Sequence, residues 1–229
     1  MARTLVVGDI HGCAEEFEAL LEKAGLAAAD RVICVGDLFA RGPRPERILD
    51  LFLSRSNFTF VLGNHDVPML EAVREDGKAS GAYDDLHPAQ AKSLKLLETR
   101  REDLRDLLDG APYLIRSGTS VGTRPWVVVH AGVHPKRGLE GTRTEEFLEL
   151  RQVDELPDKP FWWDAYDGPD LVIFGHTPRP AVIQAFRRGR RVALGLDTGC
   201  VYGGHLTGYL PDEDRFVQVK AKRRYYAKE

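Results

Sequence analysis

The sequence has no apolar run that approaches the roughly 20 residues needed to cross a bilayer. No signal peptide is expected either, because the pattern of a first strand begins by about Leu5. Cysteine is scarce, and the three that occur, Cys13, Cys34 and Cys200, lack metal-ligand spacing. An odd number of scattered cysteines is typical of free thiols in a reducing compartment. We therefore expect a cytoplasmic protein that makes no contact with a membrane.

An excess of charge of one sign is missing as well. The 229 residues include 32 basic and 35 acidic side chains, for a net charge of -3. This balance gives no general attraction to nucleic acid or anionic lipid, so we expect no stable nucleic-acid binding and only local contacts with phosphate. A hydrophobic content of 43% is typical of a globular protein. Because no repeat or linker interrupts the chain, a single domain is predicted over residues 1–229.

What the sequence does contain is a pattern that recurs five times, in which a short apolar run ends at a residue able to bind metal. The runs cover residues 5–7, 32–35, 58–62, 126–129 and 171–174. They are followed by Gly8-Asp9-Ile10-His11-Gly12, Gly36-Asp37, Gly63-Asn64-His65-Asp66, His130-Ala131-Gly132 and Gly175-His176-Thr177. Such runs are typical of buried strands, and ligands gather beyond the carboxyl ends of strands of this kind. We therefore expect these polar residues to meet in one crevice.

The donors in this pattern predict a pair of metal ions. They are two aspartates, one asparagine and three histidines: Asp9, His11, Asp37, Asn64, His130 and His176. The mixture of oxygen and nitrogen suits Mn²⁺, which we favour, or Co²⁺, Fe²⁺ or Zn²⁺, better than Ca²⁺. Asp9 and His11 stand two apart on an extended strand end and are expected to turn toward one ion. Asp37 is expected to bridge to a second ion held by the remaining three, and two ions about 3.5–4 Å apart activate water.

Three further residues indicate phosphorus as the electrophile. Arg41 follows Asp37 in the same loop, where its guanidinium is expected to hold phosphoryl oxygens; a surface cation is the alternative. His65 is placed to give a proton to the departing oxygen. Asp66 is expected to orient or charge His65, although adjacent side chains often point apart. The arrangement predicts hydrolysis without a covalent enzyme intermediate.

Helical spacing predicts crossover helices after the first two strands, which implies parallel strand pairing. Residues 67–110 read as a helical insertion near the site entrance, with a flexible loop at 75–83. Beyond Pro112 the strands at 113–116, 126–129, 171–174, 181–186, 192–196, 205–210 and 215–219 surround one helix at 144–151. The later strands are predicted to form hairpins in a second sheet, so that two sheets face each other with helices outside. The basic, aromatic tail at 220–226 is expected to be solvated.

The five motifs together resemble those of calcineurin-like metallophosphoesterases in the phosphoprotein phosphatase superfamily. The resemblance runs from Gly8 to Thr177 and continues in the segment 196–204. It implies an α/β fold with a four-layer αββα sandwich, a dinuclear centre on the six ligands, His65 as proton donor and Arg41 as phosphate clamp. It also implies a second phosphate-binding arginine between the last two metal histidines, with Arg151 the best-placed candidate and Arg137 and Arg143 as rivals.

One departure concerns the substrate. Protein serine/threonine phosphatases of this superfamily usually carry an aspartate where this chain has Ala40, and that carboxylate pairs with the catalytic histidine. The Ala40 form, Asp66 in place of a glutamate, and the segment 196–204 are instead similar to bacterial symmetrical diadenosine tetraphosphatases. These enzymes split their substrate into two nucleoside diphosphates. Because a diphosphate leaves far more readily than a serine alkoxide, a weaker general acid suffices.

We therefore predict a hydrolase that uses two metal ions to cleave dinucleoside polyphosphates, with diadenosine tetraphosphate giving two ADP and a small nucleotide as its partner. The alternatives are a serine/threonine protein phosphatase or broad phosphomonoesterase, which would have phosphoprotein partners, and a non-catalytic nucleotide sensor. The sensor is disfavoured because such proteins typically lose ligands. Trp162, Trp163 and Tyr166 offer rings for a nucleobase, although core packing is the favoured role.

Overall fold

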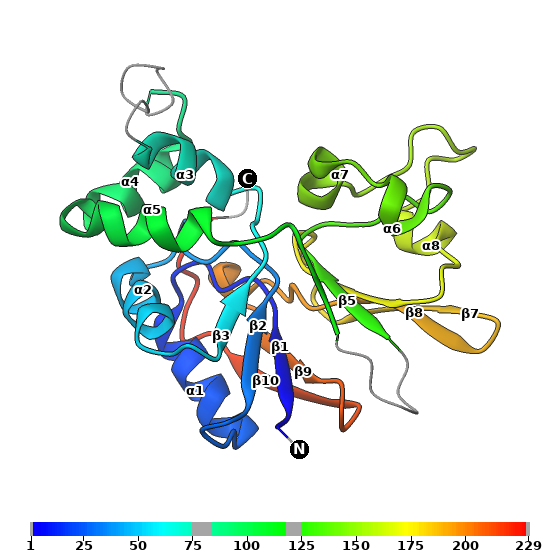
Figure 1. Cartoon of the computed structure of the whole chain (residues 1–229), viewed down its shortest axis with the longest axis horizontal. Helices are drawn as coiled ribbons and strands as arrows, with labels where there is room; N and C mark the ends of the chain where they lie inside the picture. Colours follow the sequence, from blue (N-terminus) through cyan, green and yellow to red (C-terminus); the bar gives the residue numbers. More distant parts are fainter. Residues whose placement is uncertain (1, 75–83, 118–124, 228–229) are drawn as a thin grey trace.

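Two five-stranded sheets lie face to face and helices cover their outer sides, in a computed structural model that describes residues 2–74, 84–117 and 125–227 (Figure 1). The strand order is β10-β9-β1-β2-β3 in the first sheet and β4-β5-β6-β8-β7 in the second. This is the layered α/β architecture that the motifs predicted. Within the described ranges no helix is both long enough and apolar enough to cross a membrane.

The first sheet begins with three parallel strands joined by helical crossovers. They are β1 (Thr4–Val7), β2 (Arg31–Cys34) and β3 (Phe58–Phe60), with α1 (Ala14–Ala24) and α2 (Pro45–Leu53) between them. Gly25 ends α1 in the left-handed conformation that favours glycine, at φ 63°. Because parallel strands all point the same way, the loops that follow them open at one edge of the sheet.

The second sheet has a parallel centre and antiparallel flanks. Its strands are β4 (Leu114–Arg116), β5 (Trp126–Val129), β6 (Leu171–Phe174), β7 (Ile183–Arg187) and β8 (Arg190–Gly195), of which β5, β6 and β8 run parallel. Three short helices precede β6 in the chain: α6 (Gly138–Gly141), α7 (Thr144–Glu149) and α8 (Trp162–Ala165). In Figure 1 they lie on the side of the molecule that contains the second sheet.

Alternation along the strands divides the interior into three apolar layers. In β1, Leu5 and Val7 face the helices, whereas Val6 faces the other sheet. In β6, Ile173 meets Val6 in the layer between the sheets, and Phe174 belongs to the layer beneath α8. The middle layer fixes how the two sheets lie against each other, and therefore how their loops meet.

One part of the predicted topology is wrong. The hairpin of β9 (His205–Leu210) and β10 (Arg215–Lys220) was expected in the second sheet, but β9 pairs antiparallel with β1 in the first. The local pattern of a strand does not specify which open edge it joins. Gly208, opposite Val7, permits this pairing, because a β-carbon there would lie 2.9 Å from Cδ1 of Leu5.

Residues that follow the third motif form a group of helices beside α2. The group comprises α3 (Asp66–Val73), α4 (Pro88–Leu96), the short 3₁₀ helix η1 (Glu98–Arg100) and α5 (Arg101–Asp109). The leucines of this segment at 94, 97, 104 and 108 are buried in the core that also covers the first sheet. The flexible loop predicted at 75–83 lies outside the described residues.

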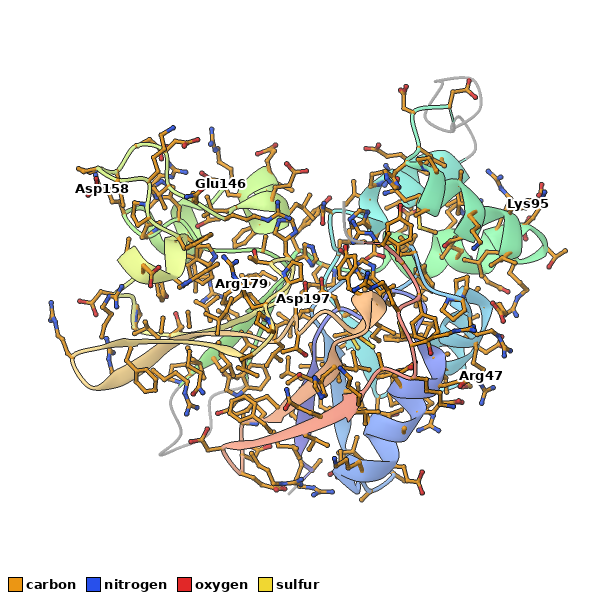
Figure 2. The ribbon with its side chains drawn as sticks, turned by 180° about the vertical axis from the view of Figure 1, so that it is seen from behind. Arg47, Lys95, Glu146, Asp158, Arg179 and Asp197 are labelled. Carbon is orange, nitrogen blue, oxygen red and sulfur yellow. The ribbon has the colours of Figure 1, made fainter. Side chains whose placement is uncertain are left out.

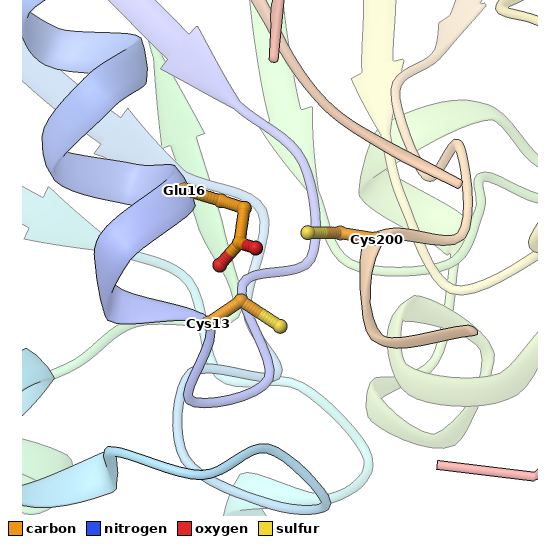
Figure 3. A group of neighbouring side chains, drawn as sticks. All are labelled: Cys13, Glu16 and Cys200. Atoms are coloured by element: carbon orange, nitrogen blue, oxygen red, sulfur yellow. The ribbon is translucent and has the colours of Figure 1, made fainter. Parts of the chain in front are cut away.

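The C-terminal tail is partly anchored, contrary to the expectation that it is solvated. The Glu16 carboxylate accepts hydrogen bonds from the backbone N–H of Lys222 at 2.9 Å and from the hydroxyl of Tyr225 at 2.6 Å. Figure 3 shows Glu16 together with Cys13 and Cys200, which are buried free thiols. The cluster therefore joins the start of α1, the tail and the 3₁₀ turn η2 (Cys200–Tyr202).

Candidate metal centre

The six predicted ligands follow five different strands and come together between the two sheets. Five of them line a pocket of about 410 Å³, and His130 lies beneath it with no exposed surface. One ligand atom each from Asp9, Asp37 and His130 lie within 4.8 Å of one another. Loops of both sheets are therefore required to assemble this site.

Several of these loops hold a non-glycine residue in the left-handed conformation. The φ angles are 48° at His11, 54° at Asp37, 77° at Arg41 and 62° at His176. Residues other than glycine rarely adopt this backbone conformation, and each such residue costs on the order of 1–3 kcal/mol. The finding corrects the expectation that Asp9 and His11 lie on an extended strand end, because β1 stops at Val7 and His11 sits in a tight turn. Backbone strain of this kind concentrates at functional sites.

Two glycines leave space for the carboxylates. A β-carbon at Gly63 would lie 2.1 Å from Oδ1 of Asp37, and one at Gly175 would lie 1.9 Å from Oδ1 of Asp9. Any other residue would therefore force the carboxylate to move. Glycine thus occurs in these motifs because a side chain would occupy the place of a ligand.

Gly63→Ala is accordingly expected to weaken cation binding by more than tenfold without unfolding the protein, because it displaces the Asp37 carboxylate. Titration with Mn²⁺ followed by calorimetry measures the affinity. The matched control is Gly110→Ala, where the nearest atom would lie 3.5 Å from the new β-carbon. Unchanged affinity in the Gly63 variant would show that Asp37 does not bind the ion.

Acceptor atoms meet around His130 in a way that favours a cation. Its Nδ1 faces the Val35 carbonyl at 2.8 Å and must donate the proton, which leaves Nε2 as an acceptor. That Nε2 lies 3.0 Å from Oδ1 of Asn64 and 3.6 Å from Oδ1 of Asp37. Oδ1 of Asn64 is also 3.1 Å from Nδ1 of His176. Acceptors that face each other repel, and a positive ion among them removes the repulsion.

Asp37 has the geometry of a bridging carboxylate. Its Oδ1 is directed at His130, as above, and its Oδ2 lies 3.6 Å from Nε2 of His11. Burial alone would raise the pKa of Asp37, but His130, His65 and His11 together hold that pKa below its ordinary value. The group is therefore ionised, with one oxygen toward each set of predicted ligands.

The remaining ligands also suit a cation. Burial lowers the pKa of His11 to about 3 and that of His176 to about 2, so both rings are neutral at physiological pH, as metal-binding imidazoles must be. Nδ1 of His11 and Nε2 of His176 are buried without a hydrogen-bond partner. Burial, together with the Asp197 and Asp37 carboxylates, raises the pKa of Asp9 well above its usual value. Divalent ions would offset the free-energy cost of ionising Asp9 in this buried position, so these residues fit a dinuclear centre.

Arg41 lies beside the expected first ion. Its Nη1 donates to Nε2 of His11 at 2.9 Å, so this guanidinium must turn away when His11 binds metal through that nitrogen. The side chain is half-buried in the wall of the pocket. A guanidinium placed there is well suited to hold phosphoryl oxygens next to the ions.

His65 also lines the pocket, and its partner comes from the helical group. Nε2 of Gln90, in α4, lies 3.5 Å from Nδ1 of His65 and donates to the His65 carbonyl at 3.1 Å. Oε1 of Gln90 accepts the N–H of His87, which fixes the orientation of the amide. Burial lowers the pKa of His65, although Asp37 partly opposes this shift. The group near His65 is therefore the neutral amide of Gln90. The same helix, α4, also binds the Phe39 carbonyl through the Ser93 hydroxyl.

The expected role of Asp66 needs correction. Its buried carboxylate accepts the N–H groups of Asp37 at 2.7 Å, Gly63 at 3.0 Å and Leu38 at 3.1 Å. It thereby joins the loops that follow β2 and β3 instead of orienting the imidazole of His65. The His65 side chain lines the pocket, whereas the Asp66 side chain is bonded to these buried amides.

Contacts in the structure distinguish the candidates for the second phosphate-binding arginine. Arg151 lines the pocket, and its Nη2 lies 3.5 Å from the His176 carbonyl. Its rivals Arg137 and Arg143 both pair with Glu146 and do not line the pocket. Sequence reasoning missed Arg179, which lines the pocket and follows His176 by only three residues. Figure 2 labels Arg179 near Asp197, whose carbonyl accepts the Arg179 N–H at 3.0 Å.

Aromatic residues of the pocket were also missed. Phe161, Tyr202 and Tyr226 line it. The rings considered from the sequence, at 162, 163 and 166, are at most 5% exposed and pack in the core of the second half, as favoured. In the sequence, the glycine pair Gly203-Gly204 directly after Tyr202 was a signal that could have identified Tyr202. No local signal marked Tyr226 in the tail.

Comparison with known proteins adds three findings. The family model for calcineurin-like phosphoesterases matches residues 2–209. A protein of Chromohalobacter salexigens named symmetrical bis(5'-nucleosyl)-tetraphosphatase is 32% identical, over 89% of this chain and 93% of its own. One of Bacillus velezensis, named asymmetrical bis(5'-nucleosyl)-tetraphosphatase, is 26% identical over 97% and 94%. A crystal structure provisionally named a diadenosine tetraphosphatase superposes with a TM-score of 0.74 at 28% identity, covering 96% of this chain and 94% of its own.

Proposed function

Because this chain belongs to the calcineurin-like phosphoesterase family, we propose that it hydrolyses dinucleoside tetraphosphates with two divalent cations, Mn²⁺ in preference to Co²⁺, Fe²⁺ or Zn²⁺. The observation that carries the proposal is the position of Asp37, whose two oxygens face different histidines in a pocket that also contains Arg41 and His65. The substrate class is supported by the names of the relatives from Chromohalobacter and Bacillus. The free thiols of all three cysteines support a cytoplasmic location.

The bound cations would supply Lewis acidity and an activated water. The protein's own groups do the rest. Arg41 turns from His11 to the substrate and holds phosphoryl oxygens with two N–H donors. His65 gives a proton to the oxygen that leaves. Asp66 joins the loops that follow β2 and β3 through its three hydrogen bonds with backbone N–H groups.

The products follow from which phosphorus is attacked. We propose symmetrical cleavage into two ADP, on the sequence features around Ala40 and on the relative with 32% identity. The test is incubation of diadenosine tetraphosphate with Mn²⁺ and the protein, followed by chromatographic separation of the nucleotides. ADP alone is the expected result. AMP together with ATP would assign asymmetrical cleavage, and no metal-dependent release of any nucleotide would refute the function.

The same assay separates the rival functions. A protein phosphatase would dephosphorylate phosphopeptides well and leave the dinucleotide intact; no relative or structure described above supports a phosphoprotein substrate. A sensor would bind the dinucleotide without turnover. In either case the proposed function fails.

Ala40→Asp is expected to raise activity on phenyl phosphate relative to diadenosine tetraphosphate. In protein phosphatases of this superfamily the aspartate at this position pairs with the catalytic histidine, so a carboxylate here is expected to give His65 the charge that Gln90 does not supply and to keep the imidazole protonated for a poorer leaving group. The ratio of the two kcat/KM values measures the effect. Ala40→Asn serves as the uncharged control, and an equal gain in both variants would contradict this explanation.

A further inference from the structure

The pocket contains an arginine next to an aromatic ring on each of its two sides. Tyr202 and Tyr226 pack against the core that covers the first sheet, whereas Phe161 packs against the core that covers the second. All three residues line the pocket that contains the candidate metal ligands. The two sides are therefore built from separate halves of the molecule.

On the first side, the ring centroids of Tyr202 and Tyr226 are both 5.7 Å from Cζ of Arg41. Tyr226 reaches this place because the tail is fastened down. The backbone N–H groups of Tyr225 and Tyr226 both donate to the Val201 carbonyl, and the Tyr225 hydroxyl donates to Glu16. The tail therefore forms part of the wall of the pocket.

On the second side, Cζ of Arg179 lies 4.9 Å from the ring centroid of Phe161. The same ring stacks on Trp163, with centroids 4.5 Å apart and planes at 3°. Because Trp163 is 5% exposed and belongs to the core, the position of Phe161 is fixed from behind. The backbone of Arg179 is held by its hydrogen bond to the Asp197 carbonyl.

We propose that these two clusters, Arg41 with Tyr202 and Tyr226 and Arg179 with Phe161, bind the two nucleoside ends of one dinucleoside polyphosphate. The inference rests on the proposed function and adds to it where each end of the substrate lies. Guanidinium groups donate to phosphate oxygens, and aromatic and guanidinium planes stack with any base. A ligand with two bases joined by a polyanion matches two such clusters with cation ligands between them.

The arrangement also determines which phosphorus is cleaved. When both nucleosides are held, the polyphosphate has a fixed position relative to the candidate metal ligands in the same pocket. If one cluster is weakened, the polyphosphate can slide relative to the ligands. A change in the product pair is therefore a signature that a merely structural role of these rings would not give.

The test uses Tyr226→Leu and Phe161→Leu, with diadenosine tetraphosphate and p-nitrophenyl phosphate as substrates. Each variant is expected to raise KM for the dinucleotide about 5- to 150-fold, the range for loss of one stacked base. Its kcat/KM for p-nitrophenyl phosphate is expected to fall much less, because this substrate has no nucleoside to lose a stacked ring. Tyr226→Leu is also expected to yield ADP mixed with AMP and ATP. Tyr226→Phe retains the ring and should retain the low KM.

Phe186→Leu is the matched control, since Phe186 is a 51% exposed ring on β7 outside the pocket. Equal losses on both substrates would assign the rings a structural role and overturn the inference, as would an unchanged KM for the dinucleotide. Binding of the dinucleotide, measured by calorimetry with and without the substitutions, separates the two proposals. If the protein binds it through these rings without turnover, the proposed function fails while the inference stands; without binding, both fail.

Discussion

Asp37→Asn is expected to lower kcat on diadenosine tetraphosphate about a thousandfold or more and to remove at least one of two bound cations. One oxygen of this carboxylate faces His11 and the other faces His130. An amide offers one neutral oxygen, so the second ion loses its bridge. Because each tenfold change in rate corresponds to about 1.4 kcal/mol, a thousandfold loss corresponds to the loss of several kcal/mol of charge stabilisation. Turnover and elemental analysis of the purified protein give the two measurements.

The matched control is Asp164→Asn, which changes an exposed aspartate of α8. It should leave turnover and metal content unchanged. Circular dichroism of Asp37→Asn should show an intact fold, because the middle apolar layer is untouched. Full activity with two bound ions in Asp37→Asn would remove the basis for a bridged centre.

His65→Gln is expected to have the second-largest effect, and its size should depend on the leaving group. General acid catalysis contributes about 10²–10⁴-fold. The loss should be near the upper end for phenyl phosphate, whose leaving oxygen needs the proton. It should be near the lower end for the dinucleotide, because a diphosphate leaves readily without full protonation. Steady-state kcat on the two substrates checks the difference.

The control for this variant is His205→Gln, since His205 begins β9 and does not line the pocket. It should retain activity on both substrates. An equal loss on both substrates in His65→Gln would mean that His65 acts by binding phosphate and not by transferring a proton to the leaving group.

The sequence was informative wherever a local pattern sets the structure. Strands β1, β2 and β6 appear where apolar runs end in glycine, and the polar residues after them come together, because parallel strands place such loops at one edge. The likeness to calcineurin-like phosphoesterases, read from these motifs, is confirmed by the family match. The roles of the individual ligands stay predictions.

Features that depend on distant contacts were not predicted. The hairpin of β9 and β10 could have joined either sheet, and only the fit of Gly208 beside Leu5 shows why it joins the first. Gln90 of α4 contacts His65, and Tyr226 of the tail lines the pocket, although both are far in sequence from every motif. The direction of the Asp66 side chain depends on three backbone amides in neighbouring loops.

The division of the predicted ligands between the two sheets has a consequence for how the protein opens. Asn64 belongs to one half and His176 to the other, yet their side chains touch through Oδ1 and Nδ1. Cations held at this seam would tie the halves together, so amide hydrogen exchange near both residues should slow when Mn²⁺ is added. A chelator should accelerate it in both loops at once and lower the denaturation temperature seen by calorimetry.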